Sequence, residues 1–215
     1  MEYAYAWDPS GTLQSWFGVR GIPHAVLVDP SGGIVWRGHP SQLDESLIEK
    51  ALETALPKPI WEVPEVHGPL SEGRVAAALK AADDLGDASD GAQIAKLLRA
   101  RIASRMETIQ TARSKGDYLK AQVMAEAAVK ELAGLPEAVT AAEVMTALAE
   151  DEEVQRVIEA QLELRGLVEM VDQVRTMSAA RDLLAKLKDM AASHEGTIVQ
   201  KHAKKAIRRL EQRMG

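Results

Sequence analysis

The residues with the most specific chemistry in this sequence are Gly21, Ile22 and Pro23, which stand directly before an apolar stretch at residues 25–29. Proline has no backbone N–H donor, so sheets accept it at edges, at first positions or in turns. A cis X-Pro bond at such a place is usually kept because the chain needs that bend. The order of these residues therefore predicts a defined turn that leads into a strand.

Two histidines, His24 and His39, lie close to the two ends of the expected strand pair. A pair of imidazoles could bind a metal ion, but no third ligand is evident in the sequence. A packing role for His24 and a loop position for His39 explain them better, so no metal site is expected. Trp36, in the returning strand, is interpreted as a packing residue.

The absence of cysteine limits the remaining chemistry. A chain of 215 residues with no cysteine has no disulfide, thiolate zinc site, iron–sulfur cluster or cysteine nucleophile. The sequence also lacks the phosphate-binding glycine motifs, the HExxH zinc motif and the GxSxG nucleophile motif. The acidic run at residues 150–153 is interpreted as favourable charge at a helix N-terminus. We therefore expect no cofactor and assign no catalytic residue.

The composition is typical of a globular protein, with 46% hydrophobic and 27% charged residues. Apolar runs such as residues 25–28 are much too short to span a bilayer, so we expect no transmembrane helix. The first five residues have neither the basic nor the apolar segment of an export signal.

The net charge of −6 gives no broad basic surface, and we expect no nucleic-acid partner. The last helix is the exception, because basic residues line one side of it: Lys201, Lys204, Lys205 and Arg208. Apolar residues line its other side, which is the ordinary division of a surface helix. Nucleic-acid binding by this helix is a minor alternative.

Proline and aromatic residues divide the chain into two parts. Eight of the nine prolines and seven of the eight aromatic residues lie within residues 3–69. The segment at residues 57–69 is rich in proline and has no clear period, so we interpret it as an extended linker. The prediction is therefore one unit at residues 1–56, the linker at 57–69, and a second domain at 70–215.

The first unit is predicted as strand, helix, strand, strand, helix. Residues 3–7 favour a strand, residues 12–17 a short helix, and residues 25–29 and 34–37 a hairpin with a glycine turn at 30–33. Ser41 is expected to cap the next helix, with Asp44 three residues on, and apolar residues from Leu43 to Ala55 form one face of it.

These residues resemble a known family. The block Gly18-Val19-Arg20-Gly21-Ile22-Pro23, followed by the hairpin and a closing helix, is similar to the C-terminal half of a thioredoxin-like domain, closest to the TlpA and redoxin branch. The resemblance covers about the first quarter of the chain. It implies an α/β fold and a cis proline at Pro23. It also implies that the backbone at Ile22 pairs with an extended protein or peptide segment, so Gly21, Ile22 and Pro23 are the expected partner-binding residues.

The half of the family that carries Cys-x-x-Cys has no counterpart here. The thiolate of that motif performs thiol–disulfide exchange, which this chain cannot run. We therefore expect the C-terminal portion of a thioredoxin-like protein with a binding or scaffolding role. The alternative is an oxidoreductase whose cysteines lie upstream of Met1, for which the family implies a periplasmic or membrane-anchored location. A third reading is a helical adaptor with a vestigial first unit.

The second part is predicted to be all-helical. Apolar residues at spacings of three and four predict helices at about 71–85, 92–114, 117–133, 137–149, 151–175, 178–193 and 197–213. The joint at residues 115–121, KGDYLKA, resembles the second helix of a tetratricopeptide motif, followed by the small residues Ala125 and Ala128. The last two helices are similar to the capping pair of such helical proteins.

Overall fold

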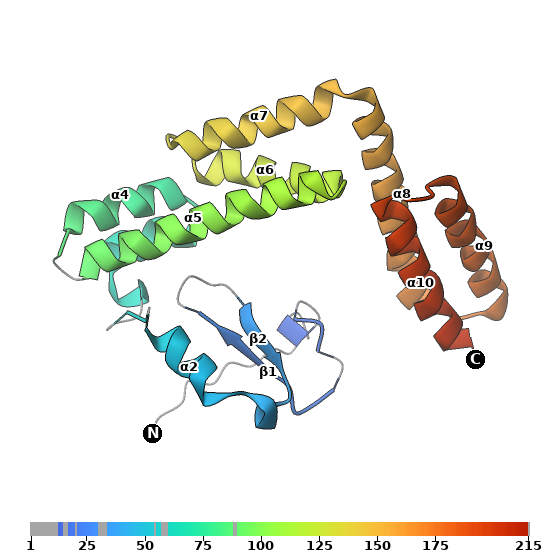
Figure 1. Ribbon diagram of the computed structural model, residues 1–215, viewed down its shortest axis with the longest axis horizontal. Helices are drawn as coiled ribbons and strands as arrows, with labels where there is room; N and C mark the ends of the chain where they lie inside the picture. The colour runs from blue at the N-terminus through green and yellow to red at the C-terminus, as the bar shows by residue number, and fades with distance from the viewer. Residues whose placement is uncertain are drawn as a thin grey trace. The chain divides into compact units, whose positions relative to one another are not determined.

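The part of the protein that the structure describes is mostly helical and contains a small antiparallel sheet (Figure 1). The computed structural model describes residues 13–14, 17–19, 21–29, 34–53, 55–56, 60–87 and 90–214. The chain forms two compact units, residues 1–72 with 77–101, and residues 73–76 with 102–215. This division does not follow the boundaries expected from the sequence, since it falls within a helix, α5 (Gly91–Ser114).

The sheet is the predicted hairpin. Strands β1 (Ala25–Val28) and β2 (Ile34–Gly38) pair antiparallel, with Leu27 opposite Trp36 and an irregularity between Leu27 and Val28. Both strands are rich in β-branched and aromatic residues, which suit a pleated surface. The strand expected at residues 3–7 lies outside the described residues. Of the helix expected at 12–17, Leu13 and Gln14 are helical, and the Phe17 N–H donates to the Leu13 carbonyl at 2.9 Å.

The helix after the hairpin, α2 (Glu45–Leu52), is capped by Asp44, so the expected cap at Ser41 is wrong. Asp44 has extended backbone angles, and its carboxylate accepts from the Ser46 N–H at 2.9 Å. Ser41 lies instead in a short 3-10 turn, η1 (Pro40–Gln42), which His39 caps. Pro40 begins this turn, and Ser41 lies inside it. Ser41 is therefore not the residue that precedes α2.

The expected extended linker at 57–69 is wrong over its described part. Residues Ile60–Glu62 form a 3-10 turn, η2, and Pro64–Ser71 form helix α3. Pro64 stands at the start of α3, where no N–H is needed, and Pro69 falls near its end. Val63 and Val66 are buried, so this proline-rich segment folds because it contributes to a core.

The next two helices meet at a close turn. Helix α4 (Val75–Leu85) starts later than expected, because Gly73 has a φ of +73° that ends α3. Helix α5 (Gly91–Ser114) begins against the end of α4. A Cβ at Gly91 would lie 2.6 Å from the carbonyl oxygens of Ala82 and Gly86, so only glycine fits there.

Five further helices complete the chain, and their bounds confirm the predicted ranges to within a few residues. They are α6 (Tyr118–Glu131), α7 (Pro136–Glu150), α8 (Glu152–Gln173), α9 (Met177–Ser193) and α10 (Ile198–Met214). Helix α6 packs on α7, and α8, α9 and α10 pack on one another (Figure 1). Asp151 caps α8 by accepting from the Glu153 and Val154 N–H groups, which is where the acidic run was expected to lie.

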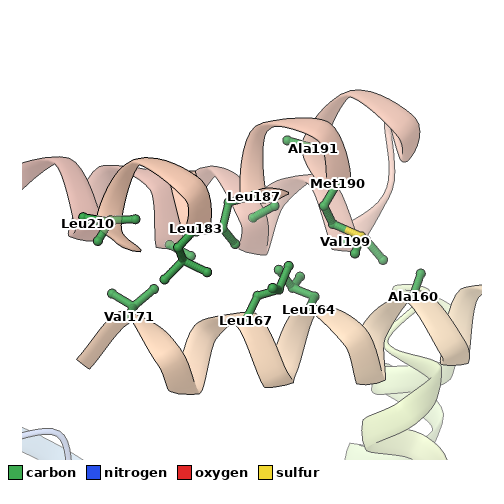
Figure 2. Close-up of a cluster of buried hydrophobic side chains, with 13 residues drawn as sticks. Ala160, Leu164, Leu167, Val171, Leu183, Leu187, Met190, Ala191, Val199 and Leu210 are labelled. Atoms are coloured by element: carbon green, nitrogen blue, oxygen red, sulfur yellow. The ribbon is translucent and has the colours of Figure 1, made fainter. Parts of the chain in front are cut away.

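The core of α8, α9 and α10 consists of buried aliphatic side chains that face one another across the three helices (Figure 2). On each helix they recur at spacings of three and four residues, as in Leu164, Leu167 and Val171 of α8. Leu187 of α9 is fully buried. Each buried leucine, valine or methionine of the cluster contributes about 1.5–3 kcal/mol by leaving water, so this bundle has the burial that a stable fold needs.

Candidate functional site

The predicted partner-binding residues Gly21, Ile22 and Pro23 form a bend directly before β1. The Ile22–Pro23 peptide bond is cis, as expected. The Ile22 side chain is 92% exposed, and the space around Gly21 is open. Within the part of the chain that the structure describes, the backbone of Ile22 makes no hydrogen bond. The loop therefore presents an apolar side chain and free backbone groups to a partner.

His24 and His39 occupy opposite positions at the same end of the hairpin. The register pairs Ala25 with Gly38, which places the two histidines opposite one another one residue further on. The His39 Nδ1 lies 2.7 Å from the Ser41 hydroxyl, and the His24 Nε2 is buried without a hydrogen-bond partner among the described residues. Among all the residues that the structure describes, no three His, Asp or Glu side chains form a cluster suited to a metal ion.

Trp36 is half-buried and packs along its own strand. A Cβ at Gly38 would lie 3.0 Å from the Trp36 ring, so the ring covers this glycine. The contact accounts for Trp36 as a packing residue.

A second site, which the sequence did not predict, is a groove of about 610 Å³ in the unit that contains residues 102–215. Three helices supply its walls: α6 from Leu119 to Met124, α8 from Gln161 to Glu169, and α10 from His202 to Arg209. The floor is apolar and includes Val123, which is 53% exposed. Its other apolar residues are Leu119, Met124, Leu164, Val168 and Ala206.

The rim of this groove is basic. Four cationic side chains border it, Lys120, Arg165, Lys205 and Arg209, against two carboxylates, Asp117 and Glu169. With His202 neutral, these six residues have a formal charge of +2 (four minus two). Arg209 is paired with Asp172, so the unpaired cations exceed the two carboxylates by one (three minus two), in a chain whose net charge is −6. The groove is therefore a positive patch on an acidic protein.

One buried polar side chain fixes the α6 wall of the groove to the α8 wall. Gln161 is 8% exposed, and its amide oxygen accepts from the Leu119 N–H at 2.7 Å. Its amide nitrogen donates to the Gly116 carbonyl, also at 2.7 Å. Both polar ends of the side chain are thus satisfied, at the turn where α6 begins.

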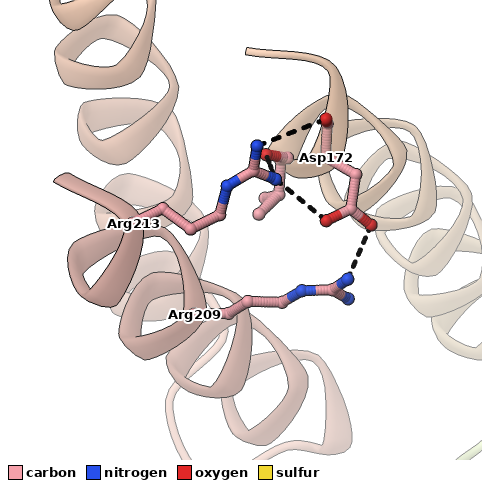
Figure 3. Close-up of polar contacts among 4 residues, drawn as sticks. Asp172, Arg209 and Arg213 are labelled. Carbon is pink, nitrogen blue, oxygen red and sulfur yellow. Dashed lines mark hydrogen bonds and ion pairs between the residues drawn. The ribbon is translucent and has the colours of Figure 1, made fainter. Parts of the chain in front are cut away.

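An acidic residue near the end of α8 holds the α10 wall. The Asp172 carboxylate accepts from Arg209 at 2.7 Å and from Arg213 at 3.0 Å (Figure 3). Arg213 also donates to the Val171 carbonyl at 2.7 Å. Because α6 and α10 are both tied to α8, the shape of the groove is set before any ligand binds.

One feature of the sequence that could have indicated this groove is the basic composition of its last helix. Helix α10 has six lysine and arginine residues and one acidic residue, Glu211. This excess of basic residues can be read from the sequence, but the apolar residues of the groove come from three separate helices. Only their packing brings these residues together.

Comparison with known proteins adds no relative: no protein-family model, no curated protein and no solved structure matches this chain. No helix in the described ranges is both long and apolar enough to cross a bilayer.

Proposed function

We propose that this chain is the C-terminal portion of a thioredoxin-like protein of the TlpA and redoxin branch, and that it binds a protein or an extended peptide without redox activity of its own. The observation that carries the proposal is the exposed Ile22 in the cis-proline loop before β1. The order of loop, hairpin and helix supports it as well.

The recognition mode follows from the loop's position. An extended segment that adds to a sheet gains main-chain hydrogen bonds, while pockets for alternate side chains give it specificity. The free backbone of Ile22 offers the first of these, and its exposed side chain offers an apolar contact. Binding therefore depends on shape and backbone pairing, and not on a charge or a metal.

A second candidate, a thiol–disulfide oxidoreductase in a longer protein, is favoured by the state of the hairpin. Ile34 and Val35 are neighbours on β2, so they point to opposite faces of the sheet, and both are close to half exposed. A sheet with apolar side chains on both faces is typical of folds that cover both faces with helices. An upstream segment that supplied this cover could also supply the missing cysteines.

The test uses an array of extended decapeptides of varied sequence, incubated with the protein and with two variants. Ile22→Asp places a charge on the exposed loop and should abolish the bound signal. Val139→Asp, at a 61% exposed valine on α7, is the matched control and should leave it unchanged. Circular dichroism of each variant checks that the fold is intact. Equal binding by all three proteins, or no peptide bound by any, would contradict the proposal.

Activity separates the two candidates. The chain as given should reduce insulin no faster than dithiothreitol alone, since exchange needs a thiolate. A longer form of the protein that contains Cys-x-x-Cys should accelerate the reaction if the oxidoreductase candidate is right. Turnover proportional to the concentration of the cysteine-free chain would overturn both.

A further inference from the structure

The groove between α6, α8 and α10 is independent of the Ile22 loop and calls for a ligand of different chemistry. From its lining we infer that it binds an amphipathic helix of a partner protein, with apolar side chains on one face and acidic residues beside them. The inference goes beyond the proposed function, because it concerns another surface of the chain and another class of partner segment.

The charges of the rim select the sign of the partner. Lys120, Arg165 and Lys205 make no ion pair in the described part of the chain. Three unpaired cations beside an apolar floor attract a ligand that carries carboxylates at its edges. Asp117 and Glu169 lower the total but do not reverse it.

The walls of the groove favour a helix over an extended peptide. All three walls are α-helices whose backbone hydrogen bonds are made internally, so they offer no strand edge. An extended segment would lose the hydration of its backbone and gain no partner for it. A helix satisfies its own backbone and needs only side-chain contacts, which is how helices bind to grooves elsewhere.

The length of the groove agrees with a short helical stretch. The lining residues of α8 run from Gln161 to Glu169, which spans about 12 Å at 1.5 Å per residue. Apolar positions i, i+3 or i+4, and i+7 of a partner helix extend over about 10.5 Å. Two turns of the partner therefore fill the apolar floor, and the ties at Gln161 and Asp172 keep the walls in place.

The experiment uses a synthetic peptide of about 18 residues with leucines at helical spacing and glutamates at the flanking positions. A second peptide keeps the leucines and replaces every glutamate with lysine. Fluorescence anisotropy measures their binding to the full chain. We expect the glutamate peptide to bind at least about tenfold more tightly, and the difference to shrink when NaCl rises from about 50 to about 500 mM.

Two variants locate the peptide on the groove. Val123→Asp introduces a charge at an exposed position of the floor and should weaken the glutamate peptide by about tenfold or more. The double variant Lys120→Glu and Lys205→Glu should reverse the preference, so that the lysine peptide binds better. Lys96→Glu with Lys186→Glu makes the same change in net charge at two residues that do not line the groove, and should keep the original preference.

Three outcomes would overturn the inference: equal binding of the two peptides, binding that survives Val123→Asp, and no binding of the glutamate peptide at millimolar concentration. Saturable binding of sodium oleate in place of the peptide would also overturn it, in favour of a small anionic amphiphile. Circular dichroism melting confirms that each variant is folded. Ile22→Asp should not alter peptide binding to the groove, so failure here is distinct from failure at the cis-proline loop.

Discussion

The hairpin region and the α8–α10 bundle contain similar aliphatic residues but bury them very differently. Within the described residues of 13–56, no side chain is buried, and Val28, Ile34 and Val35 are each close to half exposed. The bundle buries thirteen residues in one cluster. The difference lies in the number of layers, because a bundle of three helices covers its own apolar faces, whereas two strands and one helix cannot.

A pattern of apolar residues forms a core only where a second layer covers it. The strands β1 and β2 have the residue types that strands favour, and they pair as those types predict. Their stability depends on a second layer that the described hairpin region does not contain. The bundle contains every layer it needs, so its stability should respond to mutation as that of an ordinary core does.

The largest expected effect is a difference in independent folding. Residues 70–215 expressed alone should give a helical circular dichroism spectrum with a cooperative melt, because the bundle is complete within them. Residues 1–56 alone should show no cooperative transition, since they bury little apolar surface. An unfolded 70–215 fragment would show that the bundle depends on the first part of the chain.

The next effect compares one truncation in each region. Leu187→Ala removes a fully buried side chain in the bundle and should lower the free energy of unfolding by about 2–5 kcal/mol. Leu47→Ala removes a half-buried side chain in α2 and should cost about 1 kcal/mol or less. Urea unfolding followed at 222 nm measures both. A larger loss at Leu47 would mean that the hairpin region has the tighter core.

A smaller effect is expected at the polar contact that joins α6 to α8. Gln161→Ala leaves the Leu119 N–H and the Gly116 carbonyl without their partner and should cost about 1–3 kcal/mol. Gln173→Ala, at an exposed position near the end of the same helix, is the control and should be nearly neutral. The same urea titration measures both. Equal losses in the free energy of unfolding at the two positions would show that Gln161 does not hold the α6 wall of the groove to the α8 wall.

The smallest effect concerns the hairpin region, where a local cap acts in the absence of a core. The Ser46 N–H donates to the Asp44 carboxylate, and this hydrogen bond is the main reason why the pKa of Asp44 lies below its ordinary value. A second hydrogen bond, from the Ser46 side chain, lowers the pKa further. Because the pKa of Asp44 is lower in the folded than in the unfolded chain, the cap stabilises α2 at pH values above the unfolded pKa. This stabilisation is lost as the pH falls through the folded pKa.

An NMR titration of the Ser46 amide resonance measures this effect. Its midpoint should lie below that of an unperturbed aspartate, and Asp44→Asn should abolish the titration while keeping a cap. A midpoint at the ordinary value would show that the cap is not formed in solution.

The helices of the second part could be predicted because their information is local. Apolar residues at spacings of three and four, with a cap such as Asp151, fix both the type and the bounds of α8. The hairpin was predictable for the same reason. The linker prediction failed at Pro64, because composition alone does not distinguish a proline at the first position of a helix from a proline in an extended segment. Burial of Val63 and Val66 decides between the two, and burial is not local.

The candidate sites divide in the same way. The loop at Gly21, Ile22 and Pro23 is contiguous, so its residues could be named from the sequence. The groove joins Val123, Val168 and Lys205 from three helices, and its existence depends on how those helices pack. A sequence pattern shows that Lys205 lies on a polar face, but not which apolar residues of other helices lie beside it.

The close turn between α4 and α5 bears on which sequences this fold can accept. Any side chain at position 91 would push against main-chain oxygens of Ala82 and Gly86, which cannot move without unwinding α4. Gly166, in the middle of α8, has open space around it, and alanine there should raise helix stability by about 0.5–1 kcal/mol. Two glycines in helices thus have opposite tolerances. A redesign of this chain is free to replace the one at 166 but must keep the one at 91, or rebuild the turn around it.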